Sequence, residues 1–89
     1  MSWTFLSNHG HVMLYIAEFP EAKLKEIASN VGITERMVSI IISDLERAGA
    51  ISVKKVGRRN SYEVIPSFNL RHPLEENKKV SDLIRLLGE

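Results

Sequence analysis

Basic side chains are concentrated in one stretch of this 89-residue chain, residues 47–60. That stretch contains no Asp or Glu, and its five basic residues are Arg47, Lys54, Lys55, Arg58 and Arg59. Since the formal net charge of the whole chain is only +1, the distribution of charge is more informative than its sum. Lys and Arg side chains at this density bind phosphate groups, and the plain alternative is a solvated face without a partner. Because the run coincides with a predicted turn between two strands, we favour phosphate contact.

A second set of side chains that could contact a ligand recurs at helical spacing upstream. At about 100° per residue, one face of a helix carries Arg36, Ser39, Ile40, Ser43 and Arg47. Arg can bridge guanine O6 and N7 or bind a phosphate, and Ser can bond bases or phosphate oxygens. Glu35 would either accept a hydrogen bond from cytosine N4 or favour the helix N-terminus by its charge.

The sequence shows no recognisable pattern of catalytic or metal-binding residues. The chain has no cysteine, which excludes disulfides, thiolate metal sites and a thiol nucleophile. His9 and His11 are two residues apart, so they do not share a helix face and form a weak metal pattern. We therefore expect no enzyme activity, no metal and no cofactor.

The elements that would position these side chains begin with a helix-turn-helix over residues 24–48. A first helix is predicted from Leu24 to Val31, and Gly32 ends it as a left-handed residue. Thr34 can cap a second helix over residues 34–48, with Val38 and Ile41 on its buried face. The spacing of Ala28, Gly32 and Val38 is that of a DNA-binding helix-turn-helix, with an ordinary helical hairpin as the alternative.

A β-hairpin is predicted directly after the second helix, over residues 51–65. Apolar and polar residues alternate in both predicted strands, which are separated by a turn over residues 57–60. The basic residues at 54–60 lie around that turn.

The segment VGITERMVSIIISDLERAGAI followed by GRRNSYEV resembles the MarR/ArsR-like winged helix-turn-helix transcription regulators. It is most similar to very small, single-domain members that carry WTFL near the start and RHPLE near the end. The resemblance implies a mainly α-helical fold with a small β-hairpin (α+β) and double-stranded DNA as the partner. It places the recognition helix 34–48 in the major groove and the basic wing 54–60 on the phosphate backbone or in the minor groove. The expected DNA-binding residues are Thr34, Glu35, Arg36, Ser39, Ile40, Ser43, Arg47, Lys54, Lys55, Arg58, Arg59 and Asn60.

Ile40 departs from this pattern, because typical relatives carry Arg or another polar residue there. It could contact a thymine methyl group, dock a partner protein or be an isolated surface apolar residue.

Two further helices flank the motif. The first, from residue 8 to about residue 19, is apolar on nearly every side, so it needs cover from the N-terminal aromatic segment and C-terminal helix or from a second subunit. The last is predicted over residues 74–87, with Pro73 at its start. Its apolar stripe is Val80, Leu83, Ile84 and Leu87. This stripe either packs on the first helix or forms the seam of a homodimer.

The chain is therefore expected to be one winged-helix domain, residues 1–89, in the cytoplasm, since no signal peptide or membrane span is visible. The rival hypothesis is a winged-helix module for protein–protein interaction that uses Ile40 and the C-terminal helix. No separate ligand domain is apparent, so a small-molecule effector would have to bind at an interface.

Overall fold

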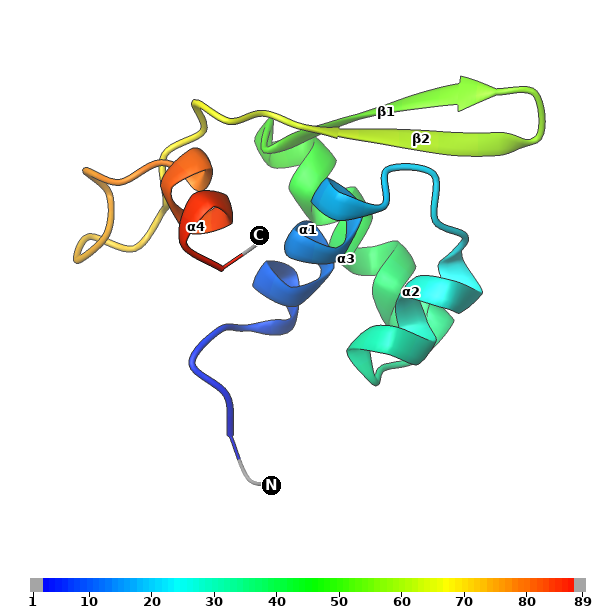
Figure 1. Cartoon of the computed structure of the whole chain (residues 1–89), viewed down its shortest axis with the longest axis horizontal. Helices are drawn as coiled ribbons and strands as arrows, with labels where there is room; N and C mark the ends of the chain where they lie inside the picture. Colours follow the sequence, from blue (N-terminus) through cyan, green and yellow to red (C-terminus); the bar gives the residue numbers. More distant parts are fainter. Residues whose placement is uncertain (1–2, 88–89) are drawn as a thin grey trace.

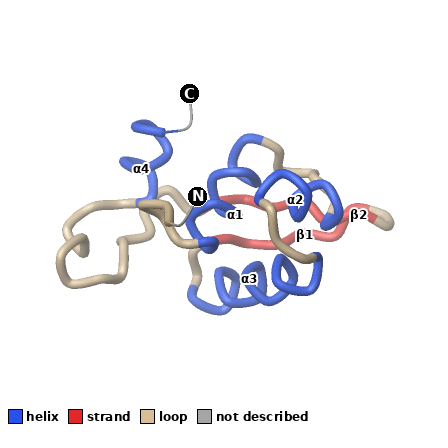
Figure 2. Tube along the Cα trace, turned by 90° about the horizontal axis from the view of Figure 1, so that it is seen from below, coloured by secondary structure: helices blue, strands red, loops and turns tan. Residues whose placement is uncertain are grey.

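The computed structural model of the protein describes residues 3–87, which form helices and one antiparallel β-hairpin (Figure 1). The element order is α1 (Asn8–Glu18), α2 (Leu24–Val31), α3 (Glu35–Ala48), β1 (Ile51–Val56), β2 (Arg59–Val64) and α4 (Val80–Leu87). The hairpin lies along the group formed by α1, α2 and α3, and α4 lies at the opposite end of the molecule from the hairpin turn (Figures 1 and 2). The predicted fold class, mainly helical with a small hairpin and a C-terminal helix, is confirmed.

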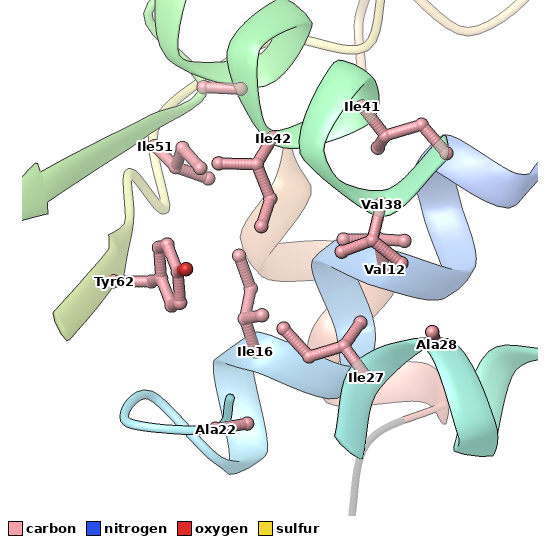
Figure 3. Packing of buried hydrophobic residues seen from close by; sticks show 11 residues of the cluster. Val12, Ile16, Ala22, Ile27, Ala28, Val38, Ile41, Ile42, Ile51 and Tyr62 are labelled. Atoms are coloured by element: carbon pink, nitrogen blue, oxygen red, sulfur yellow. The ribbon is translucent and has the colours of Figure 1, made fainter. Parts of the chain in front are cut away.

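One apolar core joins the first three helices to the hairpin (Figure 3). Its labelled members are Val12 and Ile16 of α1, Ala22, Ile27 and Ala28 around α2, Val38, Ile41 and Ile42 of α3, and Ile51 and Tyr62 of the hairpin. Burial of such side chains is the main term that stabilises a domain of this size. The core therefore fixes which face of α3 is buried and which remains exposed.

α1 begins after Ser7, whose hydroxyl accepts a hydrogen bond from the Gly10 N–H at 3.3 Å, and it ends before Pro20. The helix packs against α2, α3 and β2, and Tyr15 is half-buried on its flank. The helix-turn-helix and the hairpin therefore cover much of this helix within the same chain. The terminal segments also border it, because Leu6 lies beside Gly10 and Leu87 lines a hollow with Leu14 and Tyr15.

The hairpin has a tighter turn than the sequence predicted. β1 and β2 pair in register from Ile51 with Val64 to Val56 with Arg59, which leaves only Gly57 and Arg58 in the loop. Gly57 has a φ of 64°, as a two-residue loop of type II′ requires at its first position. The predicted four-residue turn over 57–60 is thus wrong, because Arg59 and Asn60 already belong to β2.

β2 is also attached to the α1–α2 connection. The Tyr62 N–H donates to the Pro20 carbonyl at 2.8 Å, so the segment after α1 borders the open edge of the hairpin. This contact fixes the hairpin next to the start of α2.

The C-terminal helix begins at Val80, so the predicted start at residue 74 is wrong. Residues 73–77 form successive turns, in which the Leu74 N–H donates to His72 Nδ1 at 3.1 Å and Asn69 Nδ2 donates to the Glu76 carbonyl at 2.6 Å. The helix start is instead set by Asp82, whose carboxylate accepts from the Lys79 N–H at 2.9 Å. This is the backward bond of a capping box, and it places the first turn after Lys79.

Candidate nucleic-acid interface

The turn between α2 and α3 brings the start of α3 to the surface. Gly32 has a φ of 88°, and its N–H donates to the Ala28 carbonyl at 2.8 Å, which ends α2. Two residues later, the Thr34 hydroxyl accepts a hydrogen bond from the Met37 N–H at 3.1 Å and caps α3. Thr34 keeps its own O–H proton for a further partner, because only its acceptor oxygen is used.

The outward face of α3 carries the side chains that were assigned to DNA. Val38 and Ile41 point into the core, and Arg36, Ser39 and Ser43 are exposed. Ile40 is 46% exposed and lies outside the core. The structure therefore leaves this face of α3 open along its length.

Arg47 lies apart from the other assigned residues. It is in the last turn of α3, about 20 Å along the helix axis from Thr34. Its guanidinium donates to Asp44 Oδ1 at 3.1 Å, and it borders a shallow hollow of about 350 Å³ that His9 and Arg71 also line. The structure thus groups Arg47 with the start of α1 rather than with Arg36.

Asp44 links α3 to α1. His9 Nε2 lies 2.9 Å from Asp44 Oδ2, so the carboxylate contacts both His9 and Arg47. The hydrogen bond with His9 is the main cause that lowers the pKa of Asp44, and the charge of Arg47 lowers it further. This cluster orients the C-terminal half of α3 against α1.

We call the hairpin formed by β1, β2 and their loop the wing. Its basic residues are exposed on both of its faces. Since side chains alternate along a strand, Lys55 and Asn60 share the face of the buried Tyr62, while Lys54 and Arg59 lie on the other face. Arg58 is at the turn. A hairpin with cations on both faces is suited to a groove that has phosphates on either side.

Sequence reasoning missed two basic residues beside the wing. Lys23 and Lys25, at the start of α2, line one hollow of about 400 Å³ with Arg58 and Arg59. Glu35, the first residue of α3, lines the same hollow. Lys23 and Lys25 are more than 30 positions from Arg58 in the sequence, and only their lysine side chains could have suggested the grouping.

The residues proposed for a dimer seam differ in exposure. Val80 is 3% exposed, so it is buried within its own chain and cannot belong to a seam. Leu83 and Ile84 are half-buried, whereas Leu87 is exposed. Leu86, which was not assigned to the seam, is 79% exposed.

Within residues 3–87, no His, Cys, Asp and Glu side chains gather in a group of three or more that could hold a metal ion. His11 lies within hydrogen-bond distance of Asn8 Oδ1 at 3.4 Å.

No helix in the described part of the chain is both long enough and apolar enough to cross a membrane.

No protein-family model matches the sequence, and neither does any curated protein. Among solved structures, the chain is similar to MepR, a transcription regulator of the Staphylococcus aureus multidrug efflux pump MepA, with a TM-score of 0.57 and 22% identity. That match covers 66% of this chain and 46% of MepR.

The chain is also similar to IscR of T. potens, with a TM-score of 0.54 and 26% identity over 97% of this chain and 62% of that one. The chain thus spans less than two thirds of the length of either protein. The two likenesses and the element order define the class: the chain has a winged-helix fold.

Proposed function

We propose that this chain binds double-stranded DNA as a transcription regulator, with α3 in the major groove and the wing on the phosphate backbone or in the minor groove. The observation that carries the proposal is the open outward face of α3, whose first residue, Glu35, lines one hollow with Arg58 and Arg59 of the basic wing. A helix of this width fits the major groove of B-DNA, and cations beside it can neutralise flanking phosphates.

The resemblance to transcription regulators supports the same conclusion. MepR is described as a transcription regulator, and this chain shares its fold. The second candidate function, a protein-interaction module, is favoured by exposed apolar residues such as Ile40 and Leu86. The two functions differ in salt dependence, because DNA binding weakens steeply with salt and apolar association does not.

The test replaces Arg58 and Arg59 with Ala and measures affinity for random duplex DNA over a range of salt concentrations. Each lost phosphate contact should reduce the slope of log affinity against log salt by about one unit, and the loss should be similar for every sequence.

The matched control is Lys78→Ala with Lys79→Ala, which removes the same charge from exposed positions at the other end of the molecule. Its salt slope should stay at the wild-type value. An unchanged slope in the wing variant, or an equal change in both variants, would contradict the role of the wing.

A further inference from the structure

α3 is poor in side chains that read bases through hydrogen bonds. Its 14 residues include no Asn, Gln or Lys. Asn and Gln are the side chains that form paired hydrogen bonds with adenine, while Arg forms them with guanine. Arg36 can therefore read guanine. The helix has no side-chain amide that could form paired hydrogen bonds with the adenine of an A·T base pair.

Two apolar side chains occupy the surface of α3 near its start instead. Met37 is 43% exposed and Ile40 is 46% exposed. They are three residues apart, so their Cβ atoms lie about 5–6 Å from each other on the helix surface. We call these two side chains the apolar ridge, and Arg36 precedes it directly in the same turn.

We propose that the apolar ridge reads A·T base pairs through the 5-methyl groups of thymine, so that the preferred DNA carries thymines at two neighbouring positions. This inference rests on the proposed function. The thymine methyl is the one apolar group that the major groove displays, and the base step of about 3.4 Å brings methyl groups on neighbouring pairs within reach of both side chains.

The surroundings of the apolar ridge favour DNA over a protein as its partner. Protein interfaces are depleted of charge at their centre. Here Arg36 adjoins the ridge, and Glu35 at the start of the same helix shares a hollow with Arg58 and Arg59 of the wing. An apolar contact with a cation directly beside it fits a methyl group that lies next to a phosphate.

The first experiment uses the unaltered chain, so it does not depend on the folding of any variant. A preferred duplex is selected from a random library, and each thymine in it is replaced by uracil, which keeps the base pair and removes the methyl. At two neighbouring positions the affinity should fall about fourfold per methyl, which corresponds to about 0.8 kcal/mol.

A second arm adds a methyl group rather than removing one. Cytosine at either of the two positions should bind weakly, and 5-methylcytosine should recover part of the loss, since it places a methyl at the same point of the groove. Failure of 5-methylcytosine to bind better than cytosine would count against methyl contact at that position.

The variants Ile40→Ser and Met37→Ser assign each methyl to one side chain. Each should stop distinguishing thymine from uracil at one position and keep the distinction at the other. Leu74→Ser is the matched control, because Leu74 is an exposed apolar residue in the loop before α4. It should behave as the wild type, and circular dichroism should show that all three variants are folded.

Selective binding that ignores uracil at every position would overturn the inference and leave the proposed function in place. So would an Ile40→Ser variant that keeps full discrimination but loses a protein partner. Absence of any DNA binding would overturn both.

Discussion

Asp44 has more structural consequence than its exposed position suggests. Its carboxylate contacts His9 of α1 and Arg47 of the same helix, so it sets how the end of α3 lies against α1. The carboxylate therefore joins the end of α3 to the start of α1.

The pH dependence of Asp44 can be tested by Asp44→Asn. Because the pKa of Asp44 is lowered by folding from its ordinary value of 3.8, the ionised carboxylate stabilises the folded state above that value. The contribution is lost as the pH falls through the folded-state pKa. We expect the variant to be less stable than the wild type at about pH 6, and the difference to shrink towards about pH 3.

The measurement is urea unfolding at both pH values, with Glu46→Gln as the control because Glu46 is exposed on the same helix. A stability difference for Asp44→Asn that is independent of pH would show that the side chain acts through packing alone.

At the scale of elements, the sequence predicted α2 and α3 well and α4 poorly. Gly32, Thr34 and Gly49 are local signals, and each has the backbone geometry or hydrogen bond that its residue type favours. Such signals can be recognised without knowledge of the fold. The bounds of α2 and the end of α3 follow from them.

α4 starts late for reasons that do not lie in its own sequence pattern. Pro73 and the acidic residues after it suit a first helical turn, but Asn69 and His72 bind the backbone of that segment in turns. The proximity of Lys23 to Arg58 was equally hidden, since it arises from the path of the hairpin over the start of α2. Contacts of this kind require the tertiary structure.

At the scale of the whole molecule, a homodimer is a proposal supported by exposed apolar side chains. Leu86 of α4 is 79% exposed, and Phe5 is 92% exposed in the segment before α1, where its ring meets that of Trp3 edge to face. Large exposed apolar patches mark protein–protein interaction sites. We therefore propose that Leu86 and Phe5 lie at the interface with a second copy of the chain.

Sedimentation at micromolar concentration should show a dimer whose two copies of α3 read half-sites about one helical turn apart. Leu86→Lys should shift the protein towards monomer and weaken binding to the paired site, because a charge would be buried at the seam. Leu74→Lys is the control for added charge and should remain dimeric. A stable monomer of the wild type would contradict the proposal and imply a single half-site.

The attachment of α4 has a consequence for local unfolding. α4 has eight residues and only one buried side chain, Val80, and its start is tied by the hydrogen bond from the Val80 N–H to the Phe68 carbonyl at 2.8 Å. Short helices are marginal without packing, so α4 should open without unfolding of the core. In native-state hydrogen exchange of the isolated protein, the amides of α4 should exchange much faster than those of α1 and α3. Exchange can then be measured after DNA is added and, separately, at a higher protein concentration. Dimerisation should protect α4 at the higher protein concentration even where no DNA is present.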